Sequence, residues 1–558
     1  MNFGFYRVAC ATNDTVVANC SHNASSIIKL ITKAKENNAA FLLLPELAIS
    51  AYTCSDLFLQ ETLLQNAQTE LFNIAKYTDG ICCVVGLPLK ANGMLFNCAA
   101  VLNNGSILGI VPKTYIPNYA EFYEMRHFLG AVSSLKNIEI FNSQTGACIS
   151  VPFGTDLLFT SCKNADFVLG IEICEDLWSV TPPSVQAALA GATVIANCSA
   201  SNEIIGKASY RRMLVQSHSA RLLSAYLYAD AGTGESTTDL VFAAHNLIAE
   251  NGTILAEAAP FEKTDGFIIA DIDCQALLHE RQRTTTFGQC YKNAEKTENL
   301  NYRRIELEIK PLDTQSNRLL RNIPQLPFIP QDKNNRAERC RQVIELQTAG
   351  LAKRLKHTHA KSAVIGLSGG LDSTLALLVT VNAFKKLGLD LSGICAVTMP
   401  CFGTTKRTYN NAVELANSLN VTLKEINIKA AVLQHFADIG HDENIHDVTY
   451  ENCQARERTQ VLMDIANQTG GLVIGTGDLS ELALGWATYN GDHMSMYGVN
   501  VSIPKTLVKH LVSWFADDFA AAGMQKASET LIDILDTPVS PELLPPKDGE
   551  IAQKTEDI

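Results

Sequence analysis

A glycine-rich turn constrains the fold of this chain more than any other feature of its sequence. The turn reads Gly366-Leu367-Ser368-Gly369-Gly370-Leu371-Asp372-Ser373, between an apolar run at 363–365 and a helix-forming run at 374–378. Glycines carry no Cβ atom, so successive backbone N–H groups can converge on an anion at the positive end of the following helix dipole. The pattern therefore predicts a phosphate-binding turn between a buried strand and a helix.

The side chains of this turn suit a bound nucleotide. Ser368 and Ser373 can donate hydroxyl groups, and Asp372 can hold a cation against phosphate oxygens. The spacing is not the Walker pattern, because no Gly-Lys-Ser/Thr closes the loop. It resembles instead the SGGxDS loop of the PP-loop ATP pyrophosphatases, which cleave ATP to AMP and pyrophosphate to adenylate a substrate. The resemblance implies ATP as a substrate and an adenine nucleotide alpha hydrolase-like fold.

Length and composition limit the class of protein. With 558 residues the chain can form two or three domains, and a hydrophobic content of 47% supplies sizeable cores. The formal net charge of −13 and a pI near 5.5 oppose binding to nucleic acid or to an anionic membrane. We therefore expect small-molecule substrates.

Neither the N-terminus nor the cysteines indicate export from the cytoplasm. The first residues have no basic flank and no unbroken apolar core, and no later segment joins eighteen uncharged apolar residues. We therefore expect a cytoplasmic protein without a membrane partner. The sixteen cysteines include no CxxC pair, which argues against a disulfide framework and a zinc site.

The chain divides into three stretches of different pattern. Residues 1–275 alternate short apolar strands with helical segments, as an α/β layered domain does. Within them Asn104-Gly105 predicts a two-residue hairpin, so part of the sheet is antiparallel. Residues 276–335 carry scattered charges and prolines, and we expect a linker that packs on its neighbours. Residues 336–558 open with a long helix and have the βαβ rhythm of a doubly wound parallel sheet.

Three reactive side chains stand at strand ends in the first stretch. Glu46 follows the strand at 41–45, Lys113 ends a hairpin strand, and Cys174 ends the strand at 168–173. Each residue taken singly is more often a solvated cap, a surface charge or a buried filler. Together they supply a thiol nucleophile, a general base and a cation for an oxyanion, which amide hydrolysis requires.

The sequences around these residues, LLLPEL, PKTYIPNYAEFYE and GIEICEDLW, resemble the nitrilase family. The similarity is to the glutaminase domain of glutamine-dependent NAD synthetases in particular. It implies a Glu46-Lys113-Cys174 triad and a nitrilase-like four-layer α-β-β-α sandwich. It also implies a glutamine pocket formed by Tyr119, Ser201 and Lys207. Some relatives have arginine in place of this lysine, and whether Glu121 or Glu124 adds a second catalytic carboxylate stays open.

A second group of polar residues belongs to the segments 450–458, 475–492 and 501–508. Thr476 follows an apolar strand at the carboxyl edge of the predicted sheet, where doubly wound folds bind nucleotides. Glu481 and Asp372 are two carboxylates that can hold Mg²⁺, which takes its other ligands from phosphates and water. For two acidic residues in a helical stretch, a solvated helix face is the alternative.

The run TGDLSELALGWATY resembles the C-terminal domain of the same synthetases. The resemblance implies that Lys505 lies near the ATP phosphates, and the strand-end position of Thr476 predicts that it also meets ATP. The resemblance also implies contacts to deamido-NAD from Asn452, Glu481, Trp486, Ala487, Thr488 and Tyr489. Trp486 and Tyr489 offer ring faces for stacking, although core packing is the more common role of such aromatic pairs.

The resemblance implies an amidotransferase reaction. Glutamine would be hydrolysed to supply ammonia, and ATP would adenylate deamido-NAD so that ammonia displaces AMP and leaves NAD⁺ and pyrophosphate. The family also implies a homo-oligomer. Two alternatives stay open: a PP-loop amidotransferase acting on another carboxylate, such as xanthylate or aspartate, and a non-catalytic nucleotide-binding protein.

The end of the chain departs from the family pattern. Family members continue past QKTEDI with a segment that begins GPYELHDF and carries a lysine contacting the dinucleotide. We therefore expect the synthetase domain to be truncated at its C-terminus, with glutamine hydrolysis retained and NAD⁺ synthesis poor.

Overall fold

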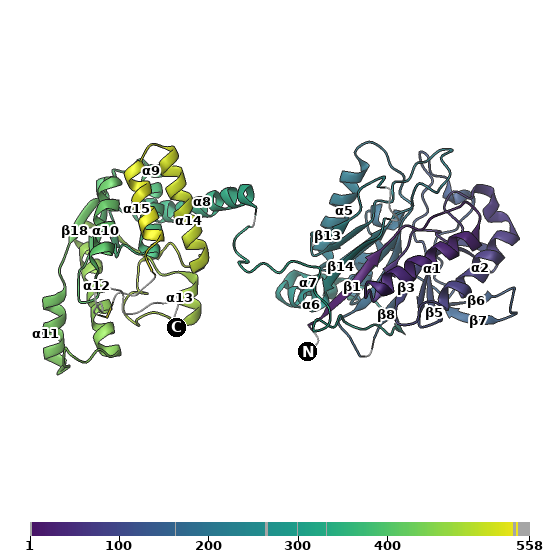
Figure 1. Ribbon diagram of the computed structural model, residues 1–558, viewed down its shortest axis with the longest axis horizontal. Coiled ribbons are helices and arrows are strands. Elements are labelled where there is room, and N and C mark those ends of the chain that lie inside the picture. Colours follow the sequence, from purple (N-terminus) through teal and green to yellow (C-terminus); the bar gives the residue numbers. More distant parts are fainter. Residues whose placement is uncertain are drawn as a thin grey trace. The chain divides into compact units, whose positions relative to one another are not determined.

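The computed structural model describes residues 3–161, 163–262, 266–297, 300–330, 332–538 and 543–544. The expectation about the chain end therefore lies outside the described residues. The chain forms two compact units, residues 1–323 and 324–558, and each is described by itself (Figure 1). None of the described helices is both long and apolar enough to cross a membrane.

The first unit contains two large β-sheets. In spatial order, the six-stranded sheet contains β14 (Ile268–Asp273), β1 (Phe5–Cys10), β2 (Phe41–Leu43), β3 (Cys82–Ala91), β4 (Met94–Asn103) and β5 (Ser106–Pro112). The seven-stranded sheet contains β13 (Thr253–Glu257), β12 (Leu247–Glu250), β11 (Ala225–Ala229), β10 (Val194–Cys198), β9 (Val168–Ile173), β8 (Leu157–Thr160) and β15 (Arg303–Glu306). A small hairpin joins β6 (Asn137–Phe141) to β7 (Cys148–Pro152).

Helices cover the outer faces of both sheets. The helices and short 3-10 turns of this unit are α1 (Cys20–Glu36), η1 (Ser55–Leu59), α2 (Glu61–Ala75), η2 (Glu124–Arg126), α3 (Glu175–Trp178), α4 (Pro183–Leu189), α5 (Lys207–Leu222), α6 (Cys274–Arg283) and α7 (Thr285–Thr297). One buried cluster joins α1 and α2 to the first sheet, a second fills the space between the sheets, and a third joins α4 and α5 to the second sheet. The predicted four-layer α-β-β-α sandwich is confirmed.

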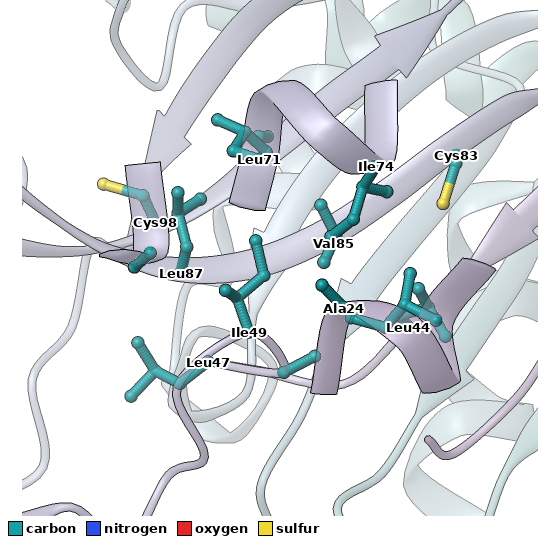
Figure 2. Close-up of a cluster of buried hydrophobic side chains, with 14 of the residues drawn as sticks. Ala24, Leu44, Leu47, Ile49, Leu71, Ile74, Cys83, Val85, Leu87 and Cys98 are labelled. Atoms are coloured by element: carbon teal, nitrogen blue, oxygen red, sulfur yellow. The ribbon is translucent and has the colours of Figure 1, made fainter. Parts of the chain in front are cut away.

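Figure 2 shows part of the first of these clusters, which lies between α1, α2 and the six-stranded sheet. Leu71 and Ile74 of α2 point toward Val85 and Leu87 of β3, and Ala24 of α1 closes the cluster from another side. The turn after β2 contributes three further apolar side chains to this layer: Leu44, Leu47 and Ile49. Because these side chains are buried, the turn between them is held firmly against the sheet.

The predicted hairpin joins β4 to β5. Asn103 pairs with Ser106, and the two residues between them have φ angles of 47° and 79°, at Asn104 and Gly105. Two successive positive φ angles are what the mirror-image hairpin turn requires, which explains the Asn-Gly pair. The prediction is confirmed, and the hairpin carries the chain back to the strand that ends before Lys113.

Residues 276–323, part of the stretch expected as a linker, belong to the first unit. They include most of α6, all of α7 and the edge strand β15, which pairs in parallel with β8. A bidentate contact of Arg303 with Asp156, at 2.6 and 3.2 Å, anchors this strand. Four residues with a polar alternation carry little strand signal, so the pairing could not be read from the sequence.

The second unit is built on a five-stranded sheet whose neighbouring strands are all parallel. In spatial order it contains β18 (Thr422–Glu425), β17 (Ile394–Thr398), β16 (Ala363–Gly366), β19 (Leu472–Gly475) and β20 (Tyr497–Gly498). One face packs against α8 (Lys333–Thr358), α9 (Leu371–Leu387), α10 (Lys406–Ser418), α14 (Lys505–Ala521) and α15 (Gln525–Leu535). The other packs against α11 (Lys429–Ile439) and α12 (Val448–Thr469). Two short elements, η3 (Leu391–Gly393) and α13 (Leu479–Leu484), complete the unit.

The strand order of this sheet reverses between β16 and β19. From β16 the chain builds outward through β17 and β18, and it then returns to add β19 and β20 on the other side. The carboxyl ends of two strands at such a reversal diverge into a crevice, the usual ligand site of doubly wound folds. The predicted doubly wound sheet is confirmed, and the turns after β16 and β19 meet at this point.

Candidate functional site

A lysine ammonium lies between two carboxylates in the core of the first unit. Lys113 Nζ donates to Glu46 Oε1 at 2.6 Å and to the two oxygens of Glu124 at 2.9 and 3.0 Å. The side chains of Lys113 and Glu46 are 0% exposed, and that of Glu124 is 7% exposed. The structure thus brings together two members of the predicted triad and adds a second carboxylate.

The turn after β2 holds Glu46 in place. Its N–H donates to the Ser199 carbonyl at 3.2 Å, and its Oε1 accepts a bond from Asn97 Nδ2 at 2.6 Å. Gly86 of β3 lies directly beneath this turn. A Cβ atom there would lie 2.2 Å from Leu47 N, so only glycine lets the two segments approach so closely.

Of the two glutamates considered for a second carboxylate, Glu121 and Glu124, it is Glu124 that lies against Lys113. Glu124 contacts Lys113 and accepts a hydrogen bond from Tyr52 OH at 2.6 Å. Glu121 instead accepts a bond from Asn202 Nδ2. Both residues lie in one irregular loop, and no periodic signal distinguishes the residue that points inward.

Cys174 occupies a sharp turn between β9 and α3. Its backbone angles are φ 44° and ψ −98°, a strained conformation for a residue with a side chain, at a cost of roughly 1–3 kcal/mol. The surrounding structure holds it there, because its N–H donates to the Cys198 carbonyl at 3.0 Å and to Asn197 Oδ1 at 2.9 Å. The side chain is buried.

The thiol and the ion cluster affect one another electrostatically. Burial raises the pKa of Cys174 well above its usual value; Glu46 and Glu124 raise it further, and Lys113 lowers it. Burial also raises the pKa of Glu46 to about 7, against the lowering effect of Lys113. Burial alone would lower the pKa of Lys113, but Glu124 and Glu46 raise it well above its usual value. A neutral thiol therefore lies near a carboxylate poised to exchange a proton at neutral pH, beside a permanent cation.

Lys207 opens α5 and lies close to this cluster. Its ammonium donates to Asn202 Oδ1 and sits 5.6 and 5.3 Å from the ring centroids of Phe122 and Trp178. Burial lowers the pKa of Lys207, and ionisation of the nearby Cys174 would act on it in the opposite direction. This partly buried cation between two rings is suited to hold a small carboxylate.

The two other residues expected at glutamine have different settings. Ser201 is buried, donates its N–H to Asp230 Oδ1 at 2.7 Å, and accepts at Oγ from Arg211 Nη2 at 3.2 Å. Tyr119 is 55% exposed, and its hydroxyl donates to both oxygens of Glu175 at 2.9 and 3.0 Å. The sequence did not single out Asn202, although its amide connects Lys207 to Glu121.

The predicted phosphate-binding turn runs from Gly366, the last residue of β16, to Ser373 in α9. Gly369 has φ +84°, and a Cβ atom there would lie 2.1 Å from the Thr408 carbonyl oxygen. Ser368 Oγ and Ser373 Oγ are 3.1 Å apart across the turn. The turn thus has the tight glycine geometry and the converging hydroxyl groups that phosphate binding requires.

A second lysine is surrounded by carboxylates beside this turn. Lys505 Nζ lies 2.7 Å from Asp372 Oδ2, 2.9 Å from Asp478 Oδ2 and 3.1 Å from Glu481 Oε1. The three carboxylates offer oxygens within 4.8 Å of one another, a donor set that suits Mg²⁺. Burial raises the pKa of Asp372 to about 6 against the lowering effect of Lys505.

The sequence analysis did not single out Asp478. It caps α13: its Oδ1 accepts from Glu481 N at 2.8 Å, and Glu481 Oε2 accepts from Asp478 N at 3.1 Å. The Asp-x-x-Glu spacing of this capping box was a readable signal. Nearby, Asn500 Nδ2 donates to the carbonyls of Asp372 and Thr476, both at 3.0 Å, and so ties the two turns together.

The residues expected at deamido-NAD follow α13 as Trp486, Ala487, Thr488 and Tyr489. Thr488 Oγ1 donates to Asn452 Oδ1 at 2.8 Å, so these two predicted residues are in contact. Tyr489 is 77% exposed and stacks on His493, while Trp486 is 39% exposed. Two partly free aromatic faces are therefore available at this end of the second unit.

Comparisons with known proteins agree with both halves of this arrangement. Residues 7–278 match the family described as carbon-nitrogen hydrolase, and residues 343–522 match the family described as NAD synthase. The glutamine-dependent NAD(+) synthetase of Mycobacterium bovis is 42% identical over 556 residues, which are 98% of this chain and 80% of that protein. The chain belongs to the glutamine-dependent NAD(+) synthetase family.

Two further proteins of the same description are also similar to this chain. The synthetase of Mycobacterium leprae is 40% identical over 562 residues, 99% of this chain and 81% of that protein. The crystal structure of the synthetase from Cytophaga hutchinsonii has a TM-score of 0.43 and 22% identity, covering 95% of this chain and 84% of that chain. The Lys113 cluster lies in the carbon-nitrogen hydrolase part of the chain, and the Lys505 cluster lies in the NAD synthase part.

Replacing Gly86 by alanine should lower the kcat for glutamine hydrolysis roughly a hundredfold, because Glu46 is a predicted catalytic residue and displacing a catalytic group by about 1 Å has that effect. The added Cβ would collide with the backbone of the turn that carries Glu46. Release of ammonia from glutamine is the measurement. Gly288→Ala, where an added Cβ meets nothing within 4 Å, is the control and should keep its activity. Full activity of Gly86→Ala would contradict the proposed tight contact.

Proposed function

We propose that Glu46, Lys113 and Cys174 hydrolyse glutamine in the first unit, and that the second unit uses the ammonia to convert deamido-NAD to NAD⁺ with ATP. The observation that carries the proposal is the buried Lys113, held at 2.6 Å from Glu46 and electrostatically coupled to the strained Cys174. Family membership over nearly the whole chain favours this reaction over another amidotransferase and over a non-catalytic role.

In the first reaction, Glu46 takes the thiol proton as Cys174 Sγ attacks the amide carbon of glutamine. The ammonium of Lys113 stabilises the oxyanion, because it is a cation held in place at a buried site where water does not screen its charge. Protonated Glu46 returns the proton to the departing nitrogen, and ammonia leaves a glutamyl thioester. Water then attacks the thioester as Glu46 accepts its proton. When the C–S bond breaks, Glu46 returns this proton to the departing sulfur, so that glutamate leaves and the thiol is restored.

Recognition of glutamine falls to the residues around Lys207. Its ammonium would pair with the α-carboxylate of the substrate, and Ser201 and Tyr119 would add polar contacts. A lysine offers a point charge in place of the bidentate fork of arginine, so orientation of the carboxylate depends on these neighbours. The rings of Phe122 and Trp178 flank the ammonium and limit its movement.

In the second reaction, a carboxylate oxygen of deamido-NAD attacks the α-phosphorus of ATP, and pyrophosphate leaves. The turn from Gly366 to Ser373 would hold the phosphates through its backbone N–H groups and hydroxyls, with Thr476 at the carboxyl end of the neighbouring strand β19. Ammonia attacks the carbonyl carbon of the resulting adenylate and loses a proton as AMP departs. Lys505 is within reach of the same turn, where it would balance negative charge on the phosphates.

We propose Mg²⁺ as the ion that accompanies ATP. Asp372 and Glu481 would hold it, with Asp478 as a further oxygen donor. The Lys505 ammonium already occupies this oxygen cage as a cation at 2.7 to 3.1 Å, which indicates that the donor set accepts positive charge. Mg²⁺ would neutralise phosphate charge during adenylation.

Deamido-NAD would lie against the aromatic faces of Trp486 and Tyr489, near Asn452 and Thr488. We also propose that the chain works in the cytoplasm as a homo-oligomer.

Ammonia is mostly protonated at neutral pH and then cannot attack the adenylate, so an enclosed route between the two reactions is expected.

Cys174→Ala should abolish glutamine hydrolysis, because the thiol serves only the first reaction. Pyrophosphate release driven by added ammonium chloride, ATP and deamido-NAD should stay at the level of the unchanged chain. Both activities are measured on the same preparation. Parallel loss of the two in a folded variant would show that the two reactions share one site.

Asp372→Asn should suppress pyrophosphate release at limiting Mg²⁺ while glutamine hydrolysis continues, because a neutral amide binds Mg²⁺ far less well than a carboxylate. The measurement is pyrophosphate release over a Mg²⁺ titration. Asp390→Asn, which alters only the exposed cap of η3, is the control. An unchanged Mg²⁺ dependence in the Asp372 variant would rule out its metal role.

The kcat/KM for glutamine hydrolysis should rise with pH through about 7, because Glu46 must be ionised to accept the thiol proton and its pKa is raised to about 7. The Glu124 carboxylate contributes to that raised pKa. Glu124→Gln should therefore move the acid limb of the profile to lower pH, in addition to any loss of rate. An acid limb near the usual glutamate pKa of about 4.3 in the unchanged chain would exclude Glu46 as the base.

A further inference from the structure

Asp176 is a buried carboxylate that the proposed reaction does not use. It lies two residues after Cys174, is 1% exposed, and is held by backbone N–H groups. Its Oδ2 accepts from Ile173 N at 3.0 Å, and its Oδ1 accepts from Tyr115 N at 2.8 Å. Thr114 N donates to both oxygens, at 3.2 and 3.4 Å.

These donors come from both sides of the proposed active site. Ile173 immediately precedes Cys174, while Thr114 and Tyr115 immediately follow Lys113. The strand before Cys174, β9, belongs to the seven-stranded sheet, and the strand before Lys113, β5, belongs to the six-stranded sheet. One carboxylate therefore connects the nucleophile turn of one sheet to the lysine strand end of the other.

An ordinary helix cap would account for only part of this geometry. Aspartate in the first turn of α3 is favourable for the helix dipole, and the bond from Ile173 N is local. The bonds from Thr114 and Tyr115 span about sixty residues of sequence and serve no helix. Burial raises the pKa of Asp176 to about 7, so keeping the charged form in this position has a cost.

A separate set of bonds fixes Cys174 to its own sheet. Asn197 of β10 accepts the Cys174 N–H and donates to Tyr226 OH of β11 at 2.9 Å, and Tyr226 OH donates to Glu172 of β9. All of these residues belong to the seven-stranded sheet. They set the conformation of the turn, and they do not determine its distance from Lys113 on the other sheet.

We propose that Asp176 is a positioning residue that fixes the thiol of Cys174 relative to the ammonium of Lys113, and so determines how well the oxyanion of the glutaminase reaction is stabilised. This inference rests on the proposed function of the first unit. Its chemical basis is the pair of carboxylate oxygens, which accept N–H donors from both turns at once. An amide at this position has one oxygen only, and its NH₂ group would face a backbone N–H in either orientation.

Asp176→Asn should lower the kcat for glutamine hydrolysis roughly a hundredfold, because a small misplacement of reacting groups has that effect. The KM for glutamine should change little, since Tyr119, Ser201 and Lys207 are not touched. Ammonia-driven pyrophosphate release should be unchanged. Asp176→Glu keeps the charge but moves the carboxylate by one methylene group, so its kcat should lie between those of Asp176→Asn and the unchanged chain.

Alkylation by iodoacetamide, followed by mass spectrometry of the Cys174 peptide, tests position without turnover. Lys113 lowers the pKa of the thiol whereas Glu46 and Glu124 raise it, so a displaced Cys174 should be alkylated with a shifted pH profile. Asp271→Asn is the matched control, because Asp271 is a buried carboxylate of the same unit that accepts from Arg7 and from Leu320 N at 2.7 Å. The Asp271→Asn variant should have a lower thermal stability and an unchanged alkylation profile.

Two outcomes would overturn the inference. One is a folded Asp176→Glu or Asp176→Asn chain whose kcat and alkylation profile match those of the unchanged chain. The other is an equal shift of the profile in Asp271→Asn, which would show that loss of stability alone produces the effect. Failure of the proposed function is distinguishable, because it would appear as glutamine hydrolysis that survives Cys174→Ala.

Discussion

The ammonium of Lys113 is the charge on which the first unit depends. Without it, Glu46 and Glu124 would be two buried like charges, and each would have to be protonated or expose itself to water. Removing one partner from a buried ion pair typically costs about 3–5 kcal/mol, because the remaining charge is left without compensation. Asn97 and Tyr52 donate further hydrogen bonds to oxygens that Lys113 also contacts, Glu46 Oε1 and Glu124 Oε1. The cluster is therefore a structural element as well as the proposed source of reactivity.

The packing of two sheets, rather than any single strand, assembles this site. Glu46 and Lys113 follow strands of the six-stranded sheet, whereas Cys174 follows a strand of the seven-stranded sheet. Each sheet alone carries an incomplete set of groups, so the proposed reactivity depends on the apolar layer that holds the sheets face to face. Polar contacts across this layer, such as Glu46 N–H to the Ser199 carbonyl, convert approximate packing into a fixed geometry. The same logic places the Asp176 carboxylate between the two turns.

The sequence predicted the elements that carry periodic or turn-specific signals. The hairpin at Asn104-Gly105, the doubly wound sheet and the strand-end positions of Glu46, Lys113 and Cys174 all follow from local patterns. Contacts between distant segments leave no such pattern. Glu124 could not be chosen over Glu121, because both lie in one irregular loop and only the fold determines which one meets Lys113. The strand β15 could not be predicted for a related reason. It forms because it pairs with β8 at the edge of the seven-stranded sheet, and the sequence does not show which strand lies at that edge.

Both units surround a lysine with carboxylates. The two lysines differ in burial, and the roles proposed for the two lysines differ accordingly. The side chain of Lys113 is 0% exposed. If it left its carboxylate partners, its ammonium would be buried without a counter-charge or water, which is strongly unfavourable. The side chain of Lys505 is 25% exposed and that of Asp372 is 21% exposed, so water can replace either partner while the other moves. A fixed cation suits the stabilisation of an oxyanion that forms at one point. An accessible cation suits a site where phosphates and Mg²⁺ arrive and depart, because its carboxylates must release it whenever another positive charge takes its place.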